Sequence, residues 1–170
     1  ELYYKLNNPT YVVNNGTPFE NYISEEIGGE IMSRNKPVIG FVGQFCFQKD
    51  VMRIVEVWAE VRKTLIDCKL LLVGDGPERA ELENYLLKNF PSESYNITGW
   101  TEVPEIYFNK MDVFILTSRF EGLPLSLVEA VSRGVTAVIS PFNGASDVAQ
   151  HAHWVKIVND NTVKAFSNMV

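Results

Sequence analysis

The feature that most constrains the fold is an alternation, from residue 38 onward, between short apolar runs and segments with helical spacing. Residues 38–43 form a continuous apolar run of strand length that ends in Gly43. The apolar residues that follow recur at the spacing of one helix face: Val51, Ile54, Val55, Trp58, Val61 and Leu65. The same pattern predicts further strands at 69–74, 95–98, 112–117 and 136–140, and helices around 82–86, 104–110 and 124–133, before a weaker strand and helix.

Strands that are apolar on both faces and alternate with helices predict a parallel sheet covered on both sides. The predicted fold class is therefore α/β, a Rossmann-like doubly wound parallel sheet with helices on both faces. Ligands of such sheets bind at the carboxyl ends of the strands. We therefore expect the site in the loops that follow strands: 43–50, 74–78, 98–103, 117–124 and 140–146.

Residues 1–37 do not join this alternation. They predict an interdomain connection with the remnant of a strand near 11–14, and residues 38–170 are expected to form the Rossmann-like domain. Because the chain begins at Glu1 rather than methionine and stops at Val170 inside a helix-like pattern, we expect a domain cut from a longer protein and truncated at its C-terminus.

Composition narrows the classes of partner. The chain has 170 residues, enough for one domain, and 46% hydrophobic with 21% charged residues is typical of a globular protein. A net charge of −6 argues against nucleic acid as a partner. The two cysteines form no disulfide framework, Cys68 beside an apolar run is expected to be buried, and a reducing cytoplasm fits best. No apolar run reaches the roughly 18 residues of a membrane span.

Metal ligands are not expected. His151 and His153 would lie on one face of a strand, as a metal pair does, but no cysteine or carboxylate cluster completes a site. Ordinary metal sites need three or four ligands, so the sequence predicts no metal site.

The loop after the fourth strand carries the densest chemistry. Pro124 suits the first turn of a helix, whose free N–H groups and positive dipole end form a phosphate site. Glu121 stands just before this helix and Glu129 lies inside it, where a carboxylate can accept two hydrogen bonds from a ribose diol. The alternative is that Glu121 is a solvated loop charge and Glu129 part of a solvated helix face.

Two other loops are less specific. Gly43 permits close backbone approach, and Lys49 precedes a helix and can reach a diphosphate as a point charge, although a lone lysine is more often an ordinary surface residue. Residues 74–78 form a glycine-rich turn without the third glycine of a dinucleotide fingerprint and without a Gly-Lys-Ser/Thr motif. A nicotinamide-dependent oxidoreductase is therefore disfavoured.

Taken together, these blocks resemble a known family. The matching segments are Phe-Val-Gly at 41–43 with Lys49, residues 71–78, Thr-Gly-Trp at 98–100, and 118–124 through Glu129-Ala130. They resemble the C-terminal nucleotide-sugar-binding domain of retaining family 4 (group 1) glycosyltransferases of the GT-B fold, over about residues 11–158. That family builds bacterial capsule, exopolysaccharide and lipopolysaccharide chains.

The resemblance implies roles for particular residues. Glu129 holds the ribose, and Lys49 neutralises the diphosphate leaving group. Glu121 is the catalytic residue, which stabilises charge or orients the donor sugar. The remaining residues implied to bind the nucleotide sugar are Gly43, Gln44, Gly76, Thr98, Gly99, Trp100, Gly122, Leu123, Pro124, Leu125 and Ser126. Of these, Thr98, Gly99 and Trp100 lie where the family contacts the base.

The sequence departs from the family at three places. Gln44 stands where relatives usually carry arginine, Asp50 stands where glycine is usual, and Gly-Ala-Ser-Asp at 144–147 replaces a segment with two glycines and a glutamate. Gln44 can donate a hydrogen bond to a phosphate but brings no charge. Asp50 adds a negative charge beside Lys49.

The resemblance also implies the partners. The donor is a nucleoside-diphosphate sugar, and a glycan or lipid-linked acceptor is bound through an N-terminal domain that this chain lacks. No cofactor or metal is required, the full-length protein is cytoplasmic or peripheral at the inner face of the cell membrane, and the isolated domain is inactive. A non-catalytic nucleotide-sugar-binding module stays open as an alternative.

Overall fold

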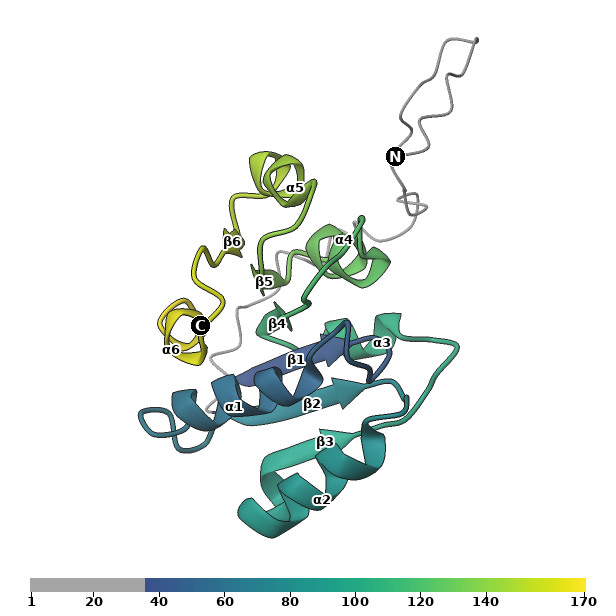
Figure 1. Cartoon of the computed structure of the whole chain (residues 1–170), viewed down its shortest axis with the longest axis vertical. Coiled ribbons are helices and arrows are strands. Elements are labelled where there is room, and N and C mark those ends of the chain that lie inside the picture. The colour runs from purple at the N-terminus through teal and green to yellow at the C-terminus, as the bar shows by residue number, and fades with distance from the viewer. Residues whose placement is uncertain (1–35) are drawn as a thin grey trace, which may run out of the picture.

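The computed structural model describes residues 36–170. Its centre is one sheet of six parallel strands in the order β3-β2-β1-β4-β5-β6 (Figure 1). The strands are β1 (Val38–Val42), β2 (Lys69–Val73), β3 (Tyr95–Ile97), β4 (Val113–Leu116), β5 (Thr136–Ile139) and β6 (Val155–Ile157). The predicted parallel α/β sheet is confirmed, and residues 1–37, assigned from the sequence to a connection, lie outside the described residues except for the last two.

Helices connect the strands. They are α1 (Val51–Val61), α2 (Arg79–Asn89), α3 (Glu105–Phe108), α4 (Leu125–Ser132), α5 (Ala145–His151) and α6 (Val163–Ser167), with a 3-10 turn, η2, at Ser92–Ser94. Two predictions were wrong. Helix α1 ends at Val61, so Leu65 lies in the following turn and is 49% exposed. His151 ends α5 rather than lying in a strand, so it does not share a strand face with His153.

The strand order places the ligand site. The chain runs outward from β1 to β3, returns to the middle of the sheet, and runs outward again from β4 to β6 (Figure 1). Because parallel crossovers are right-handed, the helices that join strands within the two halves lie on opposite faces of the sheet. Helix α6, which follows the last strand, packs against α1, and α3 packs against α4. The reversal falls between β1 and β4. The carboxyl ends of these two strands are the topological switch point, where open α/β sheets bind their ligands.

The core explains why these segments are strands and helices. The inner residues of β1, β2, β4 and β5 are almost fully buried, because helices cover both faces of the sheet. Trp58 of α1 is fully buried, and its indole N–H donates to the carbonyl of Cys68 at 3.1 Å. Cys68 is buried as expected, and burial raises the pKa of its thiol to about 11. This thiol is a core group rather than a nucleophile.

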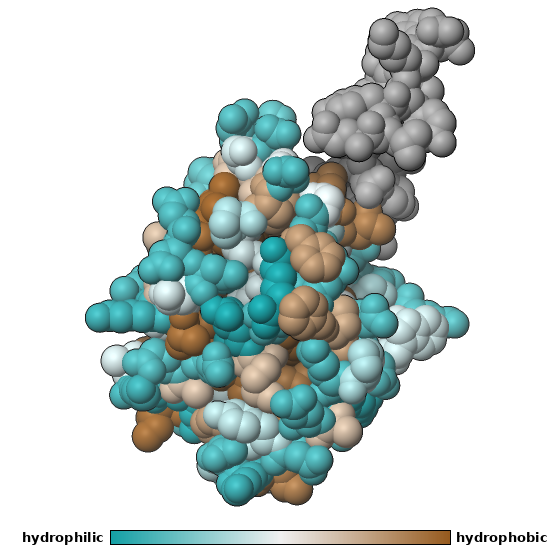
Figure 2. Space-filling model, viewed as in Figure 1, coloured by the Kyte–Doolittle hydropathy of each residue, from teal (hydrophilic) through white to brown (hydrophobic). Residues whose placement is uncertain are grey.

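The surface seen in Figure 2 is mostly hydrophilic, with apolar residues in small separate groups. The exposed large apolar side chains among the described residues include several at the carboxyl edge of the sheet, on its loops and at the start of α4: Phe47, Trp100, Val103, Phe120 and Leu125. Exposed apolar groups therefore accompany the edge at which the ligand is expected.

Candidate functional site

The loop after β1 and the loop after β4 meet at the switch point. The backbone N–H of Arg119 donates to the carbonyl of Gln48 at 2.8 Å. The hydroxyl of Thr117 donates to the carbonyl of Asp50 at 2.9 Å. Because these bonds join segments that are distant in the sequence, the two loops form one structural unit. We call residues 43–50 and 117–124 the switch-point loops.

Lys49 and Glu121 form an ion pair across the switch-point loops. The Nζ atom of Lys49 lies 2.5 Å from Oε1 of Glu121, and the two side chains are only 17% and 6% exposed. The Ser118 hydroxyl donates to the same oxygen at 2.7 Å, and Gln48 Nε2 lies 3.4 Å from Oε2. Glu121 is therefore not a solvated loop charge, and Lys49 is not an ordinary surface lysine. The structure brings together the two charged groups that the sequence singled out.

Asp50 forms a second charged cluster in the same place. Its φ of 50° is the one positive value at a non-glycine residue among residues 36–170. Glycine adopts this left-handed conformation most readily, and Asp tolerates it better than most other residues. The backbone therefore gives a physical reason for the glycine that the resemblance implies at this position. Its Oδ2 accepts from Arg53 Nε at 3.0 Å and pairs with Arg119 Nη2 at 3.1 Å. Two arginines thus compensate the negative charge that was expected to act on Lys49.

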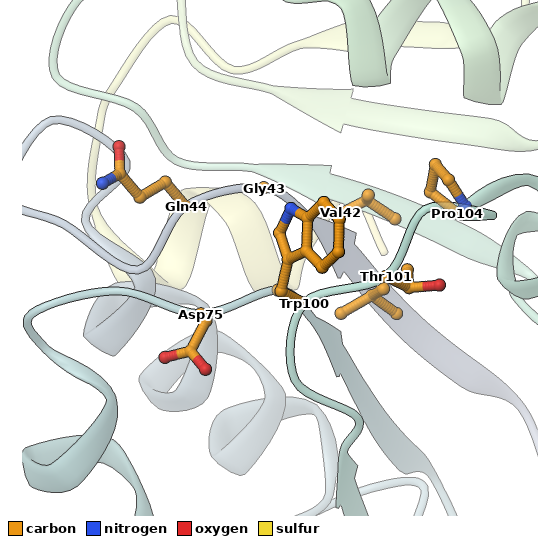
Figure 3. Close-up of a pocket in the computed structure, with 9 residues that line it drawn as sticks. Val42, Gly43, Gln44, Asp75, Trp100, Thr101 and Pro104 are labelled. Carbon is orange, nitrogen blue, oxygen red and sulfur yellow. The ribbon is translucent and has the colours of Figure 1, made fainter.

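A pocket of about 460 Å³ opens at the ends of β1 and β2. Figure 3 shows its lining: Val42, Gly43, Gln44, Val73, Gly74, Asp75, Trp100, Thr101 and Pro104. Of the predicted site residues, Gly43, Gln44 and Trp100 line the pocket. Trp100 is 72% exposed, so its indole face is free to stack on a planar ring. The carboxamide of Gln44 points away from that indole (Figure 3).

Glycines let the backbone close around this pocket. A Cβ on Gly74 would lie 1.9 Å from the carbonyl oxygen of Gly43, and one on Gly76 would lie 2.3 Å from the carbonyl oxygen of Phe45. Gly74 also pairs with Gly99 in an isolated antiparallel bridge. Gly76, Thr98 and Gly99 are not among the residues that line the pocket, and of these Gly99 is bridged to the lining residue Gly74.

Helix α4 begins one residue later than predicted. Pro124 has an extended ψ of 120° and directly precedes the helix, instead of forming its first turn. The first backbone N–H groups of the helix are then those of Leu125 and Ser126, which have no intrahelical acceptor. A Cβ on Gly122 would meet nothing within 4 Å, so the space beside this residue is open. Leu123, between Gly122 and Pro124 in the chain, is half-buried.

Glu129 lies in α4, half-buried and about one turn beyond the helix start at Leu125. Burial raises the pKa of its carboxyl group, the nearby Glu105 adds to this, and Arg133 acts in the opposite direction. A carboxylate that has lost part of its water gains from hydrogen-bond donors such as ribose hydroxyls. Its environment fits the role implied by the resemblance, and that role stays a prediction.

Metal ligands are not gathered anywhere in the part of the chain that the structure describes. No group of three or more histidine, cysteine, aspartate or glutamate side chains there could hold an ion. The Lys49 ammonium and the α4 N-terminus are two groups at the switch point that can offset a diphosphate charge.

Sequence reasoning missed four contributors: Gln48, Ser118, Arg119 and Asp75. The first three lie beside predicted residues and hold them through hydrogen bonds, and Asp75 lines the pocket. Residues 118–124 were recognised as a motif, but nothing in a linear pattern shows that Arg119 reaches back to the loop after β1. The one signal in the sequence was the unusual Asp50, whose negative charge calls for a positively charged partner.

The fold and this arrangement define a class: a Rossmann-like α/β domain with its candidate ligand site at the topological switch point. The chain belongs to the family described as Glycosyl transferases group 1, whose model matches residues 24–170. This membership excludes the nicotinamide-dependent oxidoreductase. It also agrees with the resemblance read from the sequence motifs.

Curated relatives support the family assignment. The chain is 34% identical over 128 residues to the amylovoran biosynthesis glycosyltransferase AmsD of Erwinia amylovora, covering 75% of this chain and 36% of the relative. It is 29% identical over 177 residues to an Escherichia coli enzyme named UDP-Gal:alpha-D-GlcNAc-diphosphoundecaprenol alpha-1,3-galactosyltransferase, covering 92% of this chain and 43% of the relative. The chain thus spans less than half the length of these relatives.

A solved structure supports the fold. The crystal structure of Anabaena HepE in complex with UDP and glucose superposes with a TM-score of 0.76 at 18% sequence identity, over 94% of this chain and 45% of that one. The domain therefore has the fold of one half of a GT-B glycosyltransferase. Among the described residues, no helix is both long enough and apolar enough to cross a bilayer.

Proposed function

We propose that this chain is the donor-binding domain of a retaining hexosyltransferase that moves a sugar from a nucleoside-diphosphate sugar to a glycan or lipid-linked acceptor. The observation that carries the proposal is the part-buried Lys49–Glu121 pair at the switch point. Lys49 lies on the loop that also supplies Gly43 and Gln44 to the wall of the 460 Å³ pocket. A lysine beside a helix N-terminus stabilises the negative charge that grows on a departing diphosphate.

In this proposal the pocket and the charged groups bind different parts of the donor. The base occupies the pocket against Trp100, and the ribose extends from it toward Glu129 of α4, which does not line the pocket. The diphosphate reaches Lys49 and the N–H groups at the start of α4, and the sugar approaches Glu121. Relatives named for galactosyl transfer to a lipid diphosphate and for amylovoran biosynthesis support a role in bacterial surface polysaccharide synthesis at the cytoplasmic side of the membrane.

Calorimetric titration of the chain with UDP, GDP and ADP, with a chelator present, tests this proposal. We expect one of the three to bind without added metal, and Lys49→Ala to weaken it about tenfold, as expected for a lost charge-assisted contact. Lys63→Ala is the matched control, because Lys63, in the turn after α1, pairs with Glu60 on the exposed surface. Absence of binding by all three nucleotides, or equal effects of the two lysine changes, would overturn the assignment.

A second candidate, a nucleotide-sugar-binding module without transfer, is favoured by one observation. Gln44 brings no charge, and its carboxamide points away from the indole of Trp100 (Figure 3). Sugar transfer by the full-length protein separates the two candidates. Binding of the donor with neither sugar transfer nor donor hydrolysis would favour the binding module.

A further inference from the structure

Arg119 fastens one switch-point loop to the other through several contacts. Its Nη2 lies 3.1 Å from Asp50 Oδ2, and its Nε donates to the carbonyl of Phe47 at 3.1 Å. Its guanidinium also lies over the Phe47 ring, 4.3 Å from the centroid. Together with the backbone bond to Gln48, these contacts bind the start of the loop after β4 to the whole second half of the loop after β1.

Asp50 is used for this link and not as a helix cap. It directly precedes α1, where an aspartate usually accepts a hydrogen bond from the first turn, yet its side chain makes no capping bond. The left-handed backbone turns the carboxylate toward Arg119 and Arg53 instead. The Asp50 side chain is only 10% exposed and that of Arg119 is 41% exposed, so solvent screens the pair only in part.

The two ion pairs join the same two loops and sit next to each other in the sequence. Lys49 and Asp50 are neighbours, and Arg119 and Glu121 are two residues apart. A diphosphate that takes the Lys49 ammonium breaks the first pair. Only the second pair then holds the loops in register by charge.

We propose that Arg119 and Asp50 are positioning residues that keep Lys49 aimed at the diphosphate after its bond to Glu121 is broken. This inference rests on the proposed function. It differs from a model in which Arg119 replaces the charge missing at Gln44 and contacts the diphosphate itself. The guanidinium is already engaged by a carboxylate, a carbonyl and a ring, which favours positioning.

Three variants of the chain separate the models: Arg119→Gln, Arg119→Lys and Asp50→Asn. Asparagine keeps the tolerance for the left-handed backbone but removes the charge. The control is Arg53→Gln, which also loses a bond to Asp50, but Arg53 reaches from α1 to the carbonyl of Asn161 and does not link the two loops. The readouts are the affinities for the nucleoside diphosphate that the wild-type chain binds and for its monophosphate, together with unfolding temperature.

We expect Arg119→Gln and Asp50→Asn each to weaken diphosphate binding about fivefold and to leave monophosphate binding within about twofold, as the loss of a partly exposed ion pair allows. Arg119→Lys, which keeps the charge, should recover part of the loss, and Arg53→Gln should bind like the wild type. A selective loss of this kind is not produced by general destabilisation.

Three results would overturn the inference while the wild-type chain still binds. The first is tighter diphosphate binding in Asp50→Asn, because freeing Arg119 would then supply a direct ligand. The second is unchanged binding in both charge-removing variants. The third is an equal loss for both nucleotides that follows the unfolding temperature. A wild-type chain that binds no nucleotide would instead overturn the proposed function, and this is seen before any substitution is made.

Discussion

At the residue scale, the Lys49–Glu121 pair changes what is expected of Glu121. The sequence alone suggests that Glu121→Gln leaves the affinity for a bare nucleoside diphosphate nearly intact. In the structure the carboxylate holds the Lys49 ammonium at 2.5 Å, so it competes with the diphosphate for the same cation. We therefore expect Glu121→Gln to tighten bare diphosphate binding about threefold, as loss of a modest competing ion pair allows.

Calorimetry on Glu121→Gln and on the control Glu60→Gln checks this expectation. Glu60 also pairs with a lysine, Lys63, but at the exposed C-terminal end of α1. A weaker diphosphate affinity in Glu121→Gln would show that Glu121 supports the diphosphate instead of competing with it.

Glu129 gives a prediction about pH. Burial raises the pKa of its carboxyl group in the folded chain above the ordinary value of 4.5. The folded chain therefore binds this proton more tightly than the unfolded chain does. As pH rises from the ordinary value through the raised one, ionisation of Glu129 lowers the free energy of unfolding. We expect Glu129→Gln to remove this loss, so that the variant gains stability relative to the wild type as pH rises.

Urea denaturation of both proteins between about pH 4 and pH 8 measures this difference. Ligand binding should respond in the opposite sense, because ribose hydroxyls donate to the ionised carboxylate. Diphosphate affinity of the wild type should therefore fall as pH decreases through the raised pKa, beyond the effect of phosphate protonation seen with Glu129→Gln. A stability difference that is independent of pH would contradict the assigned burial effect.

At the element scale, the ends of β1 and β2 lie close together because the glycines there have no side chains. Gly74 has a φ of +139°, and a Cβ there would lie 1.9 Å from the backbone oxygen of Gly43, which cannot move without disturbing β1. We expect Gly74→Ala to lower the free energy of unfolding by about 2 kcal/mol or more. Gly122→Ala is the control, because nothing lies within 4 Å of its Cβ position, and should change stability by less than about 0.5 kcal/mol.

Chemical denaturation measures both variants. Equal stabilities would mean that the strand ends move apart without cost. Gly122→Ala should instead weaken binding of a nucleoside-diphosphate sugar, since the open space beside Gly122 is where the proposed donor lies.

Much of the fold could be predicted because buried parallel strands have a plain signature. The runs at 38–43 and 69–74 are apolar on both faces, and the structure ends these strands within one residue of the prediction. Helix α5 was not predicted, because its seven residues show no run of apolar side chains at helical spacing. Its packing against β6 cannot be read from a local pattern. The link from Arg119 to Asp50 was missed for a similar reason, since it depends on one left-handed residue and on two loops that meet at the carboxyl ends of the adjacent strands β1 and β4.

At the scale of the whole molecule, the chain spans 36–43% of the two curated relatives described above, and its candidate site lies at one open edge of the sheet. Transfer needs an acceptor held against the donor sugar, and binding energy gained from the donor alone lowers no barrier. We therefore expect the isolated chain to bind nucleoside diphosphate without transferring sugar, and the full-length enzyme to do both.

The same reasoning predicts how Glu121 acts in the full-length enzyme. If Glu121 acts on the donor sugar while the glycosidic bond breaks, Glu121→Gln should lower kcat by about a hundredfold or more and leave KM for the donor within a few-fold, the pattern of an interaction made mainly in the transition state. Glu129→Gln should mainly raise KM, because a ribose contact is made equally before and during transfer. Steady-state kinetics of both variants measure this contrast. If Glu129→Gln loses turnover and Glu121→Gln loses donor binding, the two glutamates have exchanged roles, and the position of Glu121 beside Lys49 would then serve binding alone.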